Sequence, residues 1–135
     1  MHSMGTRSVI CGAVALLLAS VTAALCQAQF PFEHEILLDV RPLPGSRRVP
    51  ILEVFPNGRA TIDLWCRSGQ GQVEISGDGF RLALGPMREE GCTPERQRRD
   101  EDMMVALEQI TQWRIESDRL VLIGPTELRF RLSTH

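Results

Sequence analysis

The sequence predicts an α+β domain in which a curved antiparallel sheet of about seven or eight strands packs against one α-helix. Apolar and polar residues alternate through residues 60–84 and again through residues 112–132, as they do in half-buried strands. Glycine-containing turns separate these stretches. Between them, residues 93–111 change to the spacing of an amphipathic helix.

The first 28 residues have the composition and order of a secretory signal peptide. The run Val9–Leu25 is apolar and rich in small residues, and Cys26–Ala28 supplies the short side chains of a cleavage site. Cleavage before Gln29 predicts an exported chain of roughly 107 residues, in the periplasm or secreted, which suits one domain over residues 29–135. An uncleaved membrane anchor and a lipid anchor on Cys26 are the alternatives.

The strands before the helix are expected to be short and joined by tight turns. Asn57-Gly58, between two apolar runs, is the strongest short signal for a hairpin. In the strand that follows, Ile62, Leu64 and Cys66 share one face by alternation, so Trp65 is expected to point away from the core. The expected strands are Glu35–Arg41, Val49–Phe55, Ala60–Cys66, Gln72–Ser76 and Phe80–Leu84.

The helix is expected to begin at Thr93-Pro94 and to end near Thr111. Threonine is a good N-cap, and proline suits the first helical position. Met103 and Leu107 then recur at helical spacing and should face the sheet. The charged run over residues 95–102 is expected to be the solvated face of this helix. The strands expected after it are Gln112–Glu116, Arg119–Ile123 and Glu127–Leu132.

Cys66 and Cys92 are expected to form a disulfide. They remain after Cys11 and Cys26 leave with the signal peptide, and one even pair in an exported domain favours a disulfide over a metal site. No histidine lies near either cysteine in the sequence, which argues against zinc. Closing the loop between them should stabilise the fold by about 3–4 kcal/mol.

A set of residues matches the pattern of a known bacterial family. The matching residues are Phe55, Asn57-Gly58, Cys66, a later glycine at Gly69 or Gly71, Cys92, Leu107, Trp113, Asp118, Leu120, Leu122 and Phe130. Over about Val49–Leu132 the chain thereby resembles the META domain, the HslJ-like heat-shock family of bacterial envelope proteins. The resemblance implies a fold, an envelope location and an association with stress. It implies no enzymatic activity, since the family has no agreed one.

Two positions depart from the family's pattern and define a candidate contact patch. Trp65 stands where the family has glycine, and Arg67 stands where it has asparagine. Tryptophan and arginine are enriched at binding hot spots. Gly69-Gln70-Gly71 is expected to be a turn, because it lacks the third glycine and the helix of a dinucleotide-binding loop. The patch comprises Trp65, Arg67, Ser68, Gly69, Gln70 and Gly71, with Trp65 packed under the helix as the alternative.

No catalytic residue, metal site or cofactor site is predicted. His34 and His135 lie near opposite ends of the mature chain, and neither belongs to a zinc-protease or hydrolase motif. No spacing of carboxylates selects an acid/base pair. On the polar strand faces, arginines alternate with glutamates and predict an ordinary wet sheet face, with an anion-binding surface as the alternative. These arginines are Arg81, Arg114, Arg129 and Arg131.

We therefore expect an exported, non-enzymatic envelope or stress-associated protein that acts as a monomer. Its expected partner is an envelope protein or a small ligand. The alternative is a small periplasmic inhibitor of a hydrolase such as lysozyme, acting through a surface loop at Arg67–Gly71. The formal net charge of −2 argues weakly against nucleic acid as a partner. Contact with a membrane is expected only through an uncleaved signal peptide.

Overall fold

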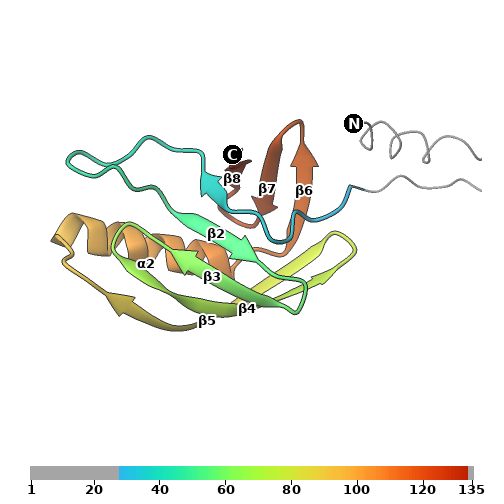
Figure 1. Cartoon of the computed structure of the whole chain (residues 1–135), viewed down its shortest axis with the longest axis horizontal. Helices are drawn as coiled ribbons and strands as arrows, with labels where there is room; N and C mark the ends of the chain where they lie inside the picture. The colour runs from blue at the N-terminus through green and yellow to red at the C-terminus, as the bar shows by residue number, and fades with distance from the viewer. Residues whose placement is uncertain (1–27, 134–135) are drawn as a thin grey trace, which may run out of the picture.

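The computed structural model describes residues 28–133, which form a closed antiparallel barrel of eight strands with one helix (Figure 1). Each strand pairs with its neighbour along the chain, and β1 pairs with β8 to close the sheet. The expected curved antiparallel sheet and single helix are present, and the sheet is also closed. The predicted signal peptide lies outside the described residues, apart from Ala28. The strands are β1 (Ile36–Leu38), β2 (Ile51–Val54), β3 (Arg59–Asp63), β4 (Arg67–Ser76), β5 (Gly79–Glu89), β6 (Gln112–Glu116), β7 (Arg119–Ile123) and β8 (Leu128–Leu132).

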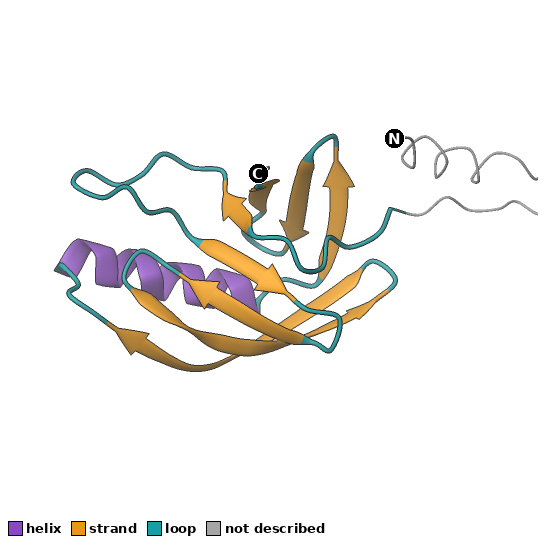
Figure 2. Cartoon of the chain, in the orientation of Figure 1, coloured by secondary structure: helices purple, strands orange, loops and turns teal. Residues whose placement is uncertain are grey.

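The helix α2 (Pro94–Glu108) lies between the long β1–β2 connection and the strands β3 to β5 (Figure 2). Thr93 is its N-cap, as predicted, and the Thr93 side chain accepts a hydrogen bond from the backbone N–H of Arg96. The Arg96 guanidinium also donates to the Gly45 carbonyl at 3.1 Å, which ties the β1–β2 connection to the helix. Within residues 28–133, no helix is long and apolar enough to cross a membrane.

Apolar side chains from every strand and from one face of α2 fill the interior. Leu120, Leu122 and Phe130 are almost completely buried on the strands after the helix. Phe130 lies on the face of β8 that alternation predicted to point inward. Phe30, ahead of the first strand, packs edge-on against Trp113 with ring centroids 5.3 Å apart. The segment before β1 is therefore part of the core.

Residues 67–71 belong to strand β4, so the prediction of a turn at Gly69-Gln70-Gly71 was wrong. Strand β4 pairs with β3 on one side and with β5 on the other, with a register shift between Gly69 and Gly71. A Cβ atom added to Gly69 would lie 2.5 Å from the Pro86 carbonyl oxygen, and one added to Gly71 would lie 2.6 Å from that of Ala83. These glycines permit the close approach of β5 to β4 at the irregularity.

The chain bends sharply between β3 and β4, and the expected alternation ends there. Strand β3 ends at Asp63, and the next three residues, Leu64, Trp65 and Cys66, are all buried. The Leu64 N–H donates to the Arg67 carbonyl at 2.7 Å, which closes the bend. The expectation that Trp65 points away from the core was therefore wrong. The indole belongs to the hydrophobic core, and only 5% of the residue is exposed.

Candidate functional site

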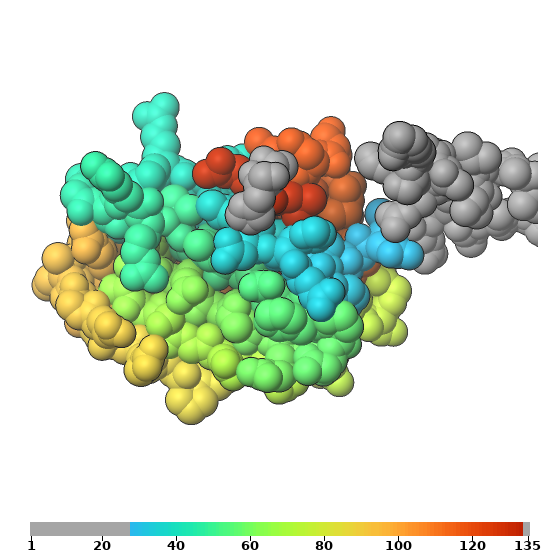
Figure 3. Space-filling model, viewed as in Figure 1, coloured from blue at the N-terminus to red at the C-terminus, as the bar shows by residue number. Residues whose placement is uncertain are grey.

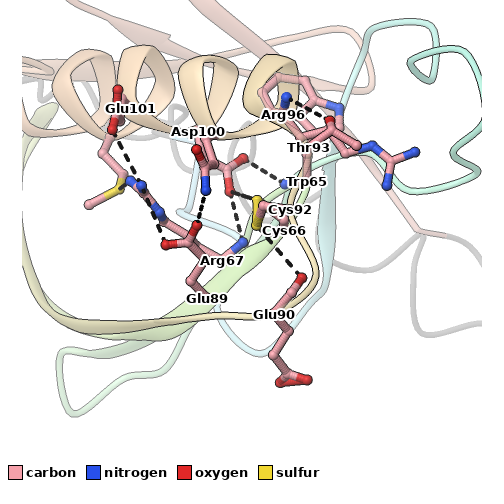
Figure 4. Close-up of a disulfide and its surroundings, with 12 residues drawn as sticks. Trp65, Cys66, Arg67, Glu89, Glu90, Cys92, Thr93, Arg96, Asp100 and Glu101 are labelled. Carbon is pink, nitrogen blue, oxygen red and sulfur yellow. Dashed lines mark hydrogen bonds and ion pairs between the residues drawn. A yellow bond between two sulfur atoms is a disulfide. The ribbon is translucent and has the colours of Figure 1, made fainter.

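A buried carboxylate on α2 holds the β3–β4 bend in place (Figure 4). Asp100 is completely buried, although the charged run that contains it was predicted to be solvated. Its Oδ1 accepts a hydrogen bond from the Trp65 N–H at 2.9 Å. Its Oδ2 accepts from the N–H groups of Cys66 at 3.0 Å and Arg67 at 2.8 Å. Successive backbone N–H groups form a concavity that favours an anion, and here a side chain of the same chain fills it.

The predicted disulfide between Cys66 and Cys92 is present and anchors the same bend. The two Cα atoms are 5.5 Å apart, and the bond joins the bend to the segment just before α2. The Cys66 Sγ lies 3.2 Å from Asp100 Oδ2, a contact without a hydrogen bond because a disulfide sulfur carries no proton. Within residues 28–133 no free cysteine remains. The bend that carries Trp65 is thus fixed by a covalent bond and by a charged acceptor.

Arg67 spans the gap between β4 and α2. Its guanidinium lies 3.3 Å from the Glu101 carboxylate and 3.8 Å from that of Glu89 (Figure 4). It also contacts the Met104 Sδ at 3.5 Å. Only 16% of the Arg67 side chain is exposed. This arginine is therefore committed to bonds within the domain.

The other residues of the predicted contact patch lie apart from Trp65. Ser68, Gly69 and Gln70 line a shallow hollow of about 620 Å³ on β3–β5, together with Thr61, Asp63 and residues 86–88. Gly71 is buried beneath β5. The structure brings Ser68 to Gln70 together but separates them from the indole of Trp65. A contact role for this part of the patch stays a prediction.

A second, partly apolar cleft of about 590 Å³ lies beside Trp65, and we call it the Trp65 cleft. It is lined by Leu38 at the end of β1, by residues 39–43 of the β1–β2 connection and by Trp65. Arg99 and Met103 of α2, Glu127 just before β8 and residues 128–129 of β8 complete the lining. Figure 3 shows the β1–β2 connection, in teal, rising at the edge of the molecule above the start of α2.

Within residues 28–133, the buried indole Nε1 of Trp65 has no hydrogen-bond partner.

The charges around the Trp65 cleft divide into paired and unpaired groups. Asp39 accepts a hydrogen bond from Arg119 at 3.0 Å, which neutralises the acidic side chain at one wall. Glu127 and Arg129 pair with each other at 3.1 Å. No ion pair or hydrogen bond among the described residues engages the side chains of Arg41 and Arg99. The cleft therefore has two unpaired guanidinium groups among its lining residues.

An ion-pair network covers the outer face of β6–β8. The Glu116 carboxylate accepts hydrogen bonds from Arg129, at 2.8 Å, and from Arg114. These bonds, that of Arg129 first, lower the pKa of Glu116 below its ordinary value of 4.5, and the bond to Glu116 raises the pKa of Arg129. Glu127 also contacts both arginines. Arg114 and Arg129 thus belong to an ordinary wet sheet face.

A family model for the META domain matches residues 19–134. This chain belongs to the META domain family. The resemblance that the sequence motifs indicated is thereby confirmed, and the match covers every strand and the helix of the barrel. No curated protein matches the chain.

Two solved structures share the fold of this META domain. One is a DUF4847 family protein from Bacteroides vulgatus, with a TM-score of 0.52 and 12% identity over 64% of this chain and 60% of that one. The other is a protein solved by NMR, with a TM-score of 0.54 and 18% identity over 73% of this chain and 88% of that one. At these identities the likeness concerns the fold alone.

Asp100 is the residue of this META domain that the sequence analysis missed. It lies three positions before Met103 and seven before Leu107, so it shares their face of α2. That spacing is the signal that could have identified it as buried. Within residues 28–133 no cluster of histidine, cysteine or acidic side chains is arranged to hold a metal ion. His34 is exposed, and His135 lies outside the described residues.

Proposed function

We propose that this META domain is an exported, non-enzymatic binding domain of the bacterial envelope, associated with stress and acting as a monomer. The observation that carries the proposal is the Cys66–Cys92 disulfide at the bend that carries Trp65. Disulfides persist in oxidising compartments such as the periplasm and are rare in the cytosol. The apolar, small-residue run Val9–Leu25 supports the same compartment.

The charged side chains of Asp100 and Arg67 are engaged in contacts within the domain, which supports a binding function rather than catalysis. Both oxygens of Asp100 accept backbone hydrogen bonds, so the carboxylate serves to hold the bend. Arg67 is occupied by acidic side chains of β5 and α2. The Trp65 cleft instead offers apolar walls and two unpaired guanidinium groups, which are features of recognition sites. A disulfide-bonded domain with such a cleft suits the binding of a small ligand.

Export is tested with the full chain expressed in a bacterial host. We expect the protein in the periplasmic fraction, with an intact mass that begins at or near Gln29 and no thiol open to alkylation before reduction. The matched control is Leu17→Arg, which places a charge within the apolar run and should retain the chain in the cytoplasm. Wild-type protein that stays in the cytoplasm and keeps Met1 would contradict the proposal.

Inhibition of a hydrolase such as lysozyme is the alternative function. Residues 67–71, expected to form its surface loop, are part of strand β4, which leaves the hollow beside Ser68, Gly69 and Gln70 as its surface. The two functions separate in a lysozyme assay with a molar excess of the domain. Unchanged lysozyme activity is expected. Stoichiometric inhibition that Gln70→Ala relieves would favour the inhibitor.

A further inference from the structure

We propose that the Trp65 cleft binds a small amphipathic carboxylate, with the anionic group at Arg41, Arg99 and the indole N–H of Trp65. The apolar body of the ligand then lies against the apolar lining residues, the exposed Val40 among them. This inference rests on the proposed binding function and names the chemistry of the ligand. A volume of about 590 Å³ falls within the range of small-molecule sites. The ligand is thus of the size of a medium-chain or aromatic acid rather than a polymer.

The apolar part of the cleft is incompletely covered by the protein. Val40 lines the cleft with 43% of the residue exposed, and it is one of two exposed large hydrophobic residues in the described chain. The other, Val105, lies on α2 outside the cleft. Leu43 and Met103 are buried residues that also line the cleft. Placing an apolar chain here would remove the exposed side of Val40 from water, which is favourable in proportion to the area covered.

The charge pattern selects an anion. The acidic lining residues are already paired, Asp39 with Arg119 and Glu127 with Arg129. Arg41 and Arg99 come from different elements, the β1–β2 connection and α2, and both are exposed. Their planar guanidinium groups match a carboxylate in bidentate geometry, and such charge-assisted hydrogen bonds are stronger than neutral ones. The unpaired charge of the cleft is therefore positive.

Trp65 supplies an independent sign that this region has a polar function. Its buried Nε1 has no partner within residues 28–133, whereas the Nε1 of Trp113 donates to the Gly77 carbonyl at 2.9 Å. A buried donor without an acceptor is costly, and native proteins contain few. In the proposed binding mode, an oxygen of the ligand's carboxylate is the acceptor of this indole N–H. The contrast between the two tryptophans also provides an internal control.

The first test is calorimetric titration of the exported domain with decanoate and, separately, with naphthoate. These probes represent a lipid-derived and an aromatic source of the same chemistry, and decanol is the neutral comparison. We expect saturable binding of at least one acid, at least about tenfold tighter than decanol, since two charge-assisted hydrogen bonds depend on the carboxylate. The better of the two acids identifies the source. Failure of both acids to bind, or equal binding of decanol, would overturn the inference.

Paired arginine substitutions locate the anionic group. Arg41→Ala with Arg99→Ala should weaken binding of the acid by about tenfold or more and abolish its advantage over decanol. The matched control is Arg81→Ala with Arg131→Ala, which removes the same charge from exposed positions outside the cleft. The control should bind as the wild type does. Equal losses in the two double variants would show a general charge effect and overturn the assignment.

The indole N–H resonances report on the cleft directly. In a nitrogen–proton correlation spectrum, the acid should shift the Trp65 indole signal and leave that of Trp113 in place, because the Trp113 N–H already has its acceptor. Trp65→Phe assigns the signal and should weaken binding. A shift confined to Trp113 would overturn the inference. Export without acid binding would refute this inference alone, whereas acid binding by a chain retained in the cytoplasm would refute the proposed export.

Discussion

The carboxylate of Asp100 on helix α2 accepts a hydrogen bond from the backbone N–H of Cys66, 34 positions earlier in the chain, at 3.0 Å. Trp65 and Arg67 donate to the same carboxylate from either side of Cys66. Three consecutive backbone N–H groups, two in the β3–β4 bend and one at the first residue of β4, therefore have their acceptor on the helix. A buried backbone donor without such a partner would be costly. The helix therefore determines the bend as much as the strands do.

Replacing Asp100 should destabilise the domain severely. Asp100→Ala removes the acceptor of three backbone N–H groups, two of them buried and one partly buried, and hydrogen bonds to a charged group are each worth about 1.5–3 kcal/mol. Because the bonds are not additive, we expect a loss of about 3–5 kcal/mol in the free energy of unfolding. Asp100→Asn should lose less, since one amide oxygen remains. Urea unfolding followed by circular dichroism measures both.

The control for Asp100 is Asp102→Asn on the same helix. Asp102 is exposed, so its substitution should change the free energy of unfolding by no more than about 0.5 kcal/mol. A loss below about 1 kcal/mol for Asp100→Ala would mean that water replaces the carboxylate at the bend. That result would show that the hydrogen bonds from helix α2 are not needed to hold Trp65 in its buried position.

The parts of the fold that depend on local pattern could be predicted from the sequence. Strands β6 and β7 have the predicted bounds. Alternation identified β6, because neighbouring side chains on a strand face opposite sides, and a short apolar run between turn residues identified β7. The helix begins at Thr93-Pro94 because capping uses residues within one turn. The disulfide followed from the count of cysteines and the expected compartment.

The candidate site could not be predicted in the same way, since its geometry depends on residues far apart in the sequence. The backbone N–H of Trp65 donates to Asp100, and at this point the chain no longer alternates between inward and outward side chains as it does in β3. Trp65 is therefore buried. Gly69 and Gly71 suit a turn equally well, and only the approach of β5 shows that they allow close strand packing. The Trp65 cleft brings together residues of the β1–β2 connection, α2 and β8. No pattern within a short stretch of sequence could indicate that these three segments lie side by side.

The disulfide should contribute substantially to stability. Cys66 and Cys92 are 26 positions apart, and opening a loop of that length costs about 3–4 kcal/mol on entropic grounds. We expect Cys66→Ala with Cys92→Ala to lose about 2–5 kcal/mol in guanidinium unfolding. Thiol alkylation before and after reduction, read by intact mass, verifies that the wild type is oxidised. Two reactive thiols in exported wild-type protein would be incompatible with the disulfide.

Trp65 should behave as a core residue in stability measurements. Only 5% of it is exposed, so Trp65→Ala is expected to cost about 3–5 kcal/mol in the free energy of unfolding. Trp65→Phe should cost less than Trp113→Phe, by about 1 kcal/mol, because only Trp113 loses an indole hydrogen bond, that to Gly77. Denaturant melts of the three variants measure these differences. If Trp65→Ala leaves the free energy of unfolding almost unchanged, Trp65 lies at the surface, as alternation predicted.

The ion-pair network on β6–β8 should make stability depend on pH in acid. Arg129 and Arg114 lower the folded-state pKa of Glu116 below its ordinary value of 4.5. A carboxyl whose pKa is lower in the folded state stabilises the fold above its unfolded pKa, and this stabilisation is lost as the pH falls through the folded value. We expect Glu116→Gln to reduce the decline of the melting temperature below pH 4.5, with the difference shrinking at high salt because the pair is exposed. Glu74→Gln, at an exposed position on β4, is the control and should follow the wild type. Identical acid profiles for wild type and Glu116→Gln would show that the network contributes nothing to folding.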